Sequence, residues 1–162
     1  MTATLITERA AAISWETRQF SRPTTPVVHP IRTAATTVDD LLDEARATYQ
    51  RISARAAYQL VLFGRAVLVD IRPESQRRAE GEVHPDLRPI VLERNVLEWR
   101  LDPRSAARLP WVTDDTRVLV LCQEGYASSL AAATLVRLGL TRATDVVGGL
   151  RAWREAGLPL AA

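Results

Sequence analysis

Cys122 is the residue best suited to nucleophilic chemistry, and it is the only cysteine among the 162 residues. It follows the apolar run VLVL at 118–121 and precedes a short loop sequence and an Ala-rich segment with helical periodicity. After VLVL alone, a cysteine would be interpreted as a small core residue. Between strand and helix, however, the chain must curl, and Gly125 permits the positive φ that a tight curl requires. Inward N–H groups and the positive end of a helix dipole then favour a thiolate.

The segment after Cys122 is therefore predicted to bind substrate, with Cys122 as the catalytic residue. Its members are Gln123, Glu124, Gly125, Tyr126, Ala127 and Ser128. Ser128 has two interpretations, as a donor to the sulfur or as the cap of the following helix. Glu124 has two as well. Its carboxylate either opposes a thiolate and an approaching dianion, or points away and fixes the loop.

Asp70 ends the segment AVLVD at 66–70, and Arg72 lies two residues after it. Arg72 would offer positive charge to a sulfur anion, or the pair would tie neighbouring loops together through charged hydrogen bonds. Both interpretations stay open from the sequence. The pair is therefore a possible supporting part of the site.

The elements that position these residues follow from apolar patterns. Strands are predicted at 66–70, 89–93, 118–121 and 143–147, and helices near 37–50, 53–63, 95–102, 128–138 and 149–157. Ser53 is predicted to cap the second helix and Gly64 to end it, Gly148 and Gly149 to form a tight turn, and Trp99 and Trp153 to lie in the core. Short apolar strands alternating with helices indicate an α/β fold, with a parallel sheet covered on both faces. In such sheets the ligand crevice lies at the carboxyl ends of the strands, where Cys122 is placed.

Residues 1–36 carry Pro23, Pro26 and Pro30 without sustained periodicity, so they are interpreted as an N-terminal arm. Residues 37–50 are interpreted as an added helix and residues 51–160 as the main domain. With 47% hydrophobic and 25% charged residues, the chain has the composition of a globular protein.

Composition also excludes several classes of function. The net charge is only +2 and the 21 basic residues, all arginine, are scattered, which argues against nucleic-acid binding. No apolar run approaches a membrane span and no signal peptide is recognisable, so a cytoplasmic protein without a membrane partner is expected. One cysteine, with His29 and His84, provides neither a disulfide nor a metal-ligand cluster, so no metal is expected. The arginine and alanine usage indicates a bacterial source.

Three motifs in order, LVDIR at 68–72, C-x-x-G-x-x-S at 122–128 and DVVGGLRAW at 145–153, resemble the rhodanese or sulfurtransferase domain over about 51–160. The resemblance implies a rhodanese-like, five-stranded parallel sheet flanked by helices on both faces. It also implies that Cys122 accepts a sulfane sulfur and becomes a persulfide, with no cofactor. The partners would be a small sulfur donor and a thiol acceptor or acceptor protein; the oligomeric state is not indicated.

The chain departs from the family pattern at two places. Many family members carry an arginine five residues after the cysteine, where this chain has Ala127, and the usual Gly-His-Ile-Pro-Gly-Ala segment reads GEVHPDLRPIVLERN from Gly81. A phosphatase, which needs a loop arginine to hold phosphate, is therefore disfavoured. A non-catalytic binding or sensor module of the same fold stays open as the main alternative to a sulfurtransferase.

Overall fold

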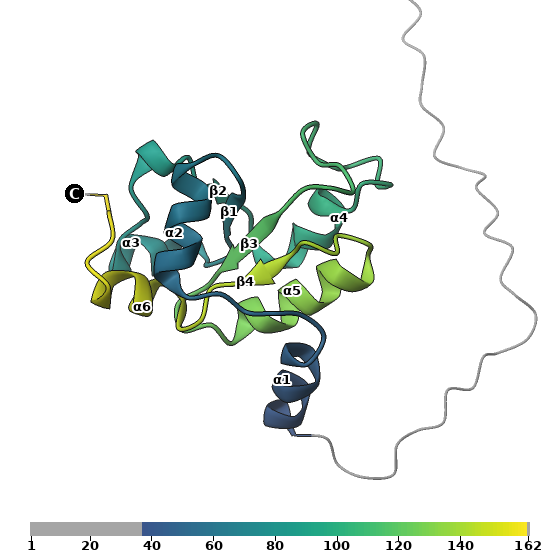
Figure 1. The fold of residues 1–162 in the computed structure, drawn as a ribbon, viewed down its shortest axis with the longest axis horizontal. Coiled ribbons are helices and arrows are strands. Elements are labelled where there is room, and N and C mark those ends of the chain that lie inside the picture. The colour runs from purple at the N-terminus through teal and green to yellow at the C-terminus, as the bar shows by residue number, and fades with distance from the viewer. Residues whose placement is uncertain (1–36, 162) are drawn as a thin grey trace, which may run out of the picture. The chain divides into compact units, whose positions relative to one another are not determined.

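The computed structural model describes residues 37–161, so the predicted arm at 1–36 lies outside the described residues. Figure 1 shows helices around a small sheet. In chain order the elements are α1 (Val38–Arg46), α2 (Ala54–Leu62), β1 (Val67–Asp70), α3 (Glu74–Glu80), the 3₁₀ turn η1 (Pro85–Leu87), β2 (Ile90–Val91), the 3₁₀ turn η2 (Arg94–Val96), α4 (Leu97–Leu101), β3 (Val118–Leu121), α5 (Ala127–Arg137), β4 (Thr144–Asp145) and α6 (Gly149–Glu155).

The sheet has the strand order β2-β1-β3-β4, and every pairing is parallel. The expectation of five strands is wrong for residues 37–161, where four strands form. At the outer edge of β4, Ile52 makes only an isolated parallel bridge with Val146. The next residue, Ser53, already caps α2 by accepting a hydrogen bond from the Ala56 N–H, so the chain has no length left for a strand.

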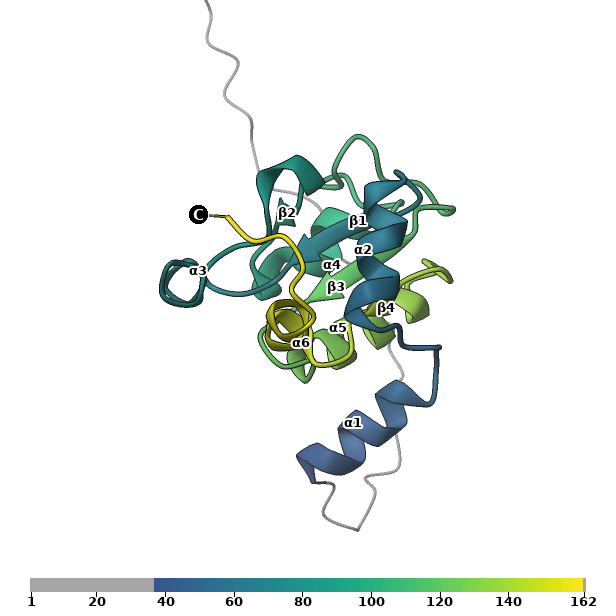
Figure 2. The same cartoon turned by 60° about the vertical axis from the view of Figure 1, so that its left-hand side comes forward.

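The two faces of the sheet are covered by different helices, as predicted for a doubly covered sheet (Figures 1 and 2). Alternate strand residues such as Val69, Val118 and Val120 pack with residues of α4 and α5. Leu68, Leu119 and Leu121 face the opposite way and pack with residues of α2 and α6. This period of two is the ordinary alternation of side chains along a strand. Cys122 continues the first set, so its side chain lies on the α5 side.

The two tryptophans assigned to the core behave differently. Trp153 is fully buried in the cluster that α2 and α6 form, as predicted. The expectation for Trp99 is wrong, because its side chain is 62% exposed. Leu97 and Leu101 are the buried residues of α4. Because they are four residues apart, they share one face of the helix, and Trp99 between them points toward solvent.

The first residues of α1 and α2 are fixed by capping side chains that the local sequence supplies. Thr37 and Asp40 form a reciprocal capping box at the start of α1, which ends at Arg46, four residues before the predicted limit. Ser53 caps α2 as predicted, and the helix ends at Leu62, just before Gly64. α3 was not predicted, because none of its residues is buried and it carries no apolar period.

Candidate functional site

Cys122 lies directly after β3 and is only 7% exposed. Two backbone N–H groups point at its sulfur: the Gly125 N lies 3.2 Å and the Ser128 N 3.4 Å from Sγ. Gly125 has a φ of +80°, as the predicted curl requires. The loop therefore surrounds the sulfur with donors that stabilise negative charge there.

The backbone of the loop is held by the start of α6. Leu150 N donates to Cys122 O at 2.9 Å, and Arg151 N donates to Gln123 O at 3.0 Å. This close approach requires Gly149, where an added Cβ would lie 2.3 Å from Cys122 O. The glycine pair thus forms the tight turn that the sequence predicts, and it also clamps the cysteine loop.

Ser128 lies between the sulfur and a buried carboxylate. Its Oγ is 3.2 Å from Cys122 Sγ, which donates to it, and the hydroxyl itself donates to Asp145 Oδ2 at 3.1 Å. Ser128 is not the cap of α5, since the helix begins at Ala127 and Tyr126 holds the N-cap position. Of the two interpretations for Ser128, the structure therefore places it toward the sulfur.

Asp145 is a fully buried carboxylate beneath the loop. It accepts hydrogen bonds from Arg51 Nε and Nη2, both at 2.8 Å, and from the Tyr49 hydroxyl at 2.9 Å. The hydrogen bonds from Arg51 to Asp145 raise the pKa of the Arg51 guanidinium. The pKa of Tyr49 is raised above its usual range, first by burial and then by the neighbouring Asp145 charge.

Sequence reasoning missed this cluster of Tyr49, Arg51 and Asp145. One signal was present: Asp145 is a charged residue inside the apolar run ATDVV, and a buried charge requires partners. Its partners lie about a hundred residues earlier in the chain, so no local pattern identifies them. The cluster connects the segment between α1 and α2, through Asp145, to Ser128 of the cysteine loop.

Two arginines approach the loop from other segments, although the loop itself contains none. Arg46 Nη2 and Arg51 Nη2 donate to Gly125 O at 3.2 and 3.1 Å. The Arg46 guanidinium also lies 5.7 Å from the centre of the exposed Tyr126 ring. Both guanidinium groups therefore hold the loop through its backbone carbonyl.

Asp70 and Arg72 form a buried pair at the end of β1. Arg72 is 1% exposed and donates from Nη2 to Asp70 Oδ2 at 2.6 Å and to Gly81 O at 3.0 Å. A longer contact of 3.5 Å joins Arg72 Nη1 to Gln123 Oε1. The structure thus places the pair as a tie between β1, the segment after α3 and the side chain of Gln123.

Glu124 turns toward α6, where its Oε1 lies 2.7 Å from Arg151 Nη1. Both side chains are about half exposed. The structure favours the interpretation in which Glu124 fixes the loop, and it brings a cation to the carboxylate that sequence reasoning did not anticipate. Ala127 is exposed at the start of α5.

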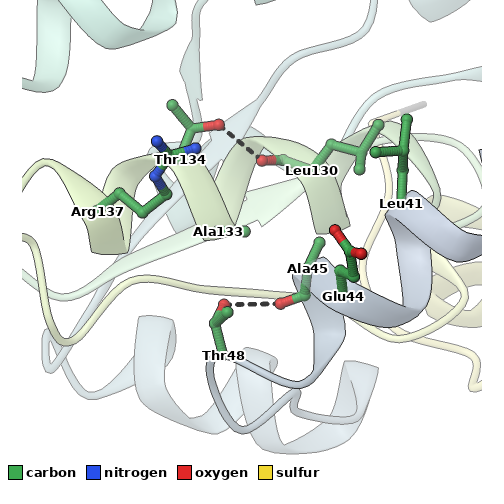
Figure 3. A pocket seen from close by; sticks show the side chains of 8 residues that line it. All are labelled: Leu41, Glu44, Ala45, Thr48, Leu130, Ala133, Thr134 and Arg137. Atoms are coloured by element: carbon green, nitrogen blue, oxygen red, sulfur yellow. Dashed lines mark hydrogen bonds between the residues drawn. The ribbon is translucent and has the colours of Figure 1, made fainter. Parts of the chain in front are cut away.

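A groove of about 280 Å³ lies apart from this site, between α1 and α5 (Figure 3). Leu41 and Ala45 line it from α1, and Leu130, Ala133 and Arg137 from α5. It contains no residue of the cysteine loop.

Two further features of residues 37–161 concern metal binding and membrane insertion. Within this range no three His, Cys, Asp or Glu side chains gather in a group able to hold a metal ion. In the same residues, no helix has the length and apolar character needed to cross a bilayer.

Comparisons with known proteins identify a family and similar proteins. The model of the rhodanese-like domain matches residues 53–156. The thiosulfate sulfurtransferase GlpE of Actinobacillus succinogenes is 28% identical in an alignment of 116 positions, which covers 69% of this chain and 90% of that protein.

Two solved structures are similar as well. A Rhodopseudomonas palustris protein of unknown function, described as a possible tyrosine phosphatase, has a TM-score of 0.70 and 29% identity, covering 81% of this chain and 98% of that one. The human single-domain sulfurtransferase TSTD1 has a TM-score of 0.51 and 25% identity, covering 65% and 95%.

Proposed function

Because the chain belongs to the rhodanese-like domain family, we propose that it is a sulfurtransferase that carries a sulfane sulfur on Cys122. The observation that carries this proposal is the pair of N–H groups, from Gly125 and Ser128, directed at the single sulfur atom. The similarity to GlpE, a thiosulfate sulfurtransferase, supports the same reaction class. The domain would span 51–160, with 37–50 as an added helix and 1–36 as an arm.

The reaction has two steps. The Cys122 thiolate attacks the outer sulfur of thiosulfate or of a persulfide, an S–S bond forms on Cys122, and sulfite or a thiolate leaves with the electron pair of the broken S–S bond. An acceptor thiolate then attacks the outer sulfur of Cys122–S–S⁻ and carries it away, which restores the Cys122 thiolate. The same amides that face the sulfur support the negative charge of the persulfide. Each step exchanges one S–S bond, so no cofactor is needed.

The acceptor must come from outside the chain. Cys122 is the only cysteine in the sequence, so no second thiol of the same chain can resolve the persulfide. A small thiol or an acceptor protein therefore has to reach the loop. The exposed Tyr126 and Glu124 form part of the surface that such an acceptor would meet.

Phosphatase activity is the second candidate, because the similar Rhodopseudomonas palustris protein is described as a possible tyrosine phosphatase. Phosphoryl transfer from this loop would need a guanidinium that grips the phosphate. Arg46 and Arg51 donate to Gly125 O, and Arg51 is also paired with Asp145. The other two arginines that contact the loop are paired with carboxylates as well, Arg72 with Asp70 and Arg151 with Glu124. These contacts favour sulfur transfer over phosphate hydrolysis.

The experiment uses one preparation of the full chain and its Cys122→Ser variant. Thiosulfate, a small persulfide and an aryl phosphate are supplied separately, with cyanide or a thiol as the sulfur acceptor. The proposal predicts transfer from at least one sulfur donor, loss of that transfer in Cys122→Ser, and no phosphate release. Phosphate release that depends on Cys122 would establish the second candidate instead. A folded wild type inactive with every donor would indicate a binding or sensor module.

A further inference from the structure

A chain of hydrogen bonds runs from the sulfur of Cys122 to a buried carboxylate. The thiol donates to Ser128 Oγ at 3.2 Å, and the Ser128 hydroxyl donates to Asp145 Oδ2 at 3.1 Å. Ser128 and Asp145 are both fully buried. A hydroxyl has a single proton, so while Ser128 donates to Asp145 it can only accept from the sulfur. This arrangement fits a neutral thiol.

Asp145 accepts hydrogen bonds from donors other than Ser128. Arg51 donates twice, at 2.8 Å each, and the Tyr49 hydroxyl lies at 2.9 Å. The Ser129 hydroxyl also lies 3.1 Å from Oδ2, but it is closer to Gly125 O, at 2.8 Å, and has only one proton to donate. Because the two bonds from Arg51 are charge-assisted, the carboxylate keeps most of its stabilisation without Ser128. The Ser128 proton is therefore the one that Asp145 can most easily give up.

We propose that Asp145 is a positioning residue that acts on Cys122 through Ser128, whose hydroxyl rotates from Asp145 to the sulfur when the thiol ionises. The inference rests on the proposed function, in which the thiolate is the nucleophile. On ionisation the thiol proton leaves to water, the S–H···O bond is lost and an O–H···S⁻ bond replaces it; no electrons move. Asp145 thus opposes ionisation by competing for the Ser128 proton, and Arg51 weakens that competition by holding the carboxylate.

The charged and titratable groups around the loop come from several elements. They are Arg46 of α1, Tyr49 and Arg51 before α2, Asp70 and Arg72 at β1, Asp145 of β4, and Glu124 with its partner Arg151 of α6. Of these groups, Asp145 is the one to which the Ser128 hydroxyl donates. A change at Asp145 therefore reaches the sulfur through Ser128, whereas a change in general charge would not depend on that hydroxyl.

The test is a double-mutant cycle on the full chain with Ser128→Ala, Asp145→Asn and the combined variant. The ratio of thiolate to thiol is followed by ultraviolet absorbance and by the alkylation rate across a pH series, with no sulfur donor present. Ser128→Ala should lower the ratio about fivefold, the effect of one lost hydrogen bond to a thiolate. Asp145→Asn should raise it about fivefold, because the new amide can donate to Ser128 Oγ and leave the hydroxyl proton for the sulfur.

The combined variant decides the mechanism. If Asp145 acts through Ser128, Asp145→Asn changes nothing once Ser128 is alanine. An equally large effect in the Ser128→Ala background would show that the charge of Asp145 acts directly on the sulfur and would overturn the proposal. A lower ratio in Asp145→Asn alone would overturn it too.

Glu98→Gln is the matched control, because Glu98 is a largely buried carboxylate paired with an arginine, Arg94, at 2.7 Å. It should lower the melting temperature without changing the thiolate ratio. If Asp145→Asn does not fold, Arg51→Gln is compared with and without Ser128→Ala, because the charge of Arg51 also interacts with Cys122 directly. The ratio should fall about fivefold more with Ser128 present than with alanine there, and an equal fall in both backgrounds would contradict the proposal.

The two proposals can fail separately. The ionisation measurements need no sulfur donor, so a protein that follows them but never accepts sulfur would refute the proposed function alone. A protein that transfers sulfur through Cys122, but whose thiolate ratio ignores Asp145 and Ser128, would refute the role of Asp145 alone.

Discussion

Arg51 meets the buried carboxylate of Asp145 through two hydrogen bonds of 2.8 Å, directly beneath the loop that holds Cys122. Arg51 lies just before the segment that matches the family model, whereas Asp145 lies within it. The same guanidinium also donates to Gly125 O at 3.1 Å. A residue outside the matched segment therefore holds both the buried Asp145 and the backbone of the cysteine loop at Gly125.

Removing the Tyr49 hydroxyl should change how stability depends on pH. The pKa of Tyr49 in the folded protein lies above the ordinary value of about 10, because of burial and the Asp145 charge. The stability that this group contributes is thus complete below about pH 10 and declines above it, where the unfolded chain releases the proton first. The largest slope is about 1.4 kcal/mol per pH unit.

Denaturant unfolding of wild type and Tyr49→Phe across this pH range measures the effect. The variant should be less stable by about 1 kcal/mol below pH 9, for the lost hydrogen bond. The difference should shrink as the pH rises above about 10. A difference that stays constant to higher pH would show that Tyr49 ionises equally in both states.

Gly149→Ala should destabilise the fold, because the new Cβ would lie 2.3 Å from Cys122 O and 2.6 Å from the Gln123 carbonyl carbon. With the added cost of a φ of +58°, we expect a loss of about 3 kcal/mol in the free energy of unfolding. Gly157→Ala is the control, since its φ is +67° but no atom lies within 4 Å of the added Cβ. It should cost about 1 kcal/mol. Equal losses would show that the close approach at Gly149 is not important.

Two truncations should distinguish the contribution of residues 1–36 from that of α1 to stability and sulfur acceptance. Deleting residues 1–36 should leave thermal stability and sulfur acceptance largely intact, because apolar periodicity begins only at about residue 37. Deleting residues 1–47 should impair both. It removes Leu42 and Ala45, which are buried, and Arg46, which bonds to Gly125 O and Ser129 Oγ. Melting curves and donor assays of both truncations, against the full chain, give the answer. Equal behaviour of the two would contradict a bracing role for α1.

The Glu124–Arg151 pair should tune the choice of donor. Arg151→Gln leaves an unpaired carboxylate near the loop and should lower kcat/KM for the thiosulfate dianion about twofold, with less effect on a persulfide. Glu124→Gln should raise the thiosulfate value by a similar factor, and the double variant should lie near wild type. Wild type should itself use a small persulfide better than thiosulfate. Added salt should reduce all these differences. If both donors respond equally, Glu124 acts only as a scaffold residue.

Local patterns in the sequence predicted the strand at 118–121, the cap at Ser53 and the tight turn at Gly148 and Gly149, because each depends on neighbouring residues. Other features depend on distant ones. The fifth strand is reduced to the Ile52 bridge by the early start of α2, and the exposure of Trp99 depends on what α4 packs against.

The site divides in the same way. The curl of the loop around Cys122 follows from Gly125 and the strand-to-helix pattern, so it was predictable. The placement of Ser128 toward Asp145, and the pairing of Asp145 with Arg51, join residues 17 and 94 positions apart. Such contacts arise only when β4 lies beside β3, which no local pattern in the sequence specifies.

The central claim, that Cys122 alone carries the sulfur, is tested most directly by the intact mass of the protein after incubation with thiosulfate and, separately, with a small persulfide. The account predicts an adduct of one sulfur atom on wild type, which is lost on addition of an acceptor thiol and is absent from Cys122→Ser. A one-sulfur adduct on Cys122→Ser, or a folded wild type that never gains sulfur from either donor, would contradict it.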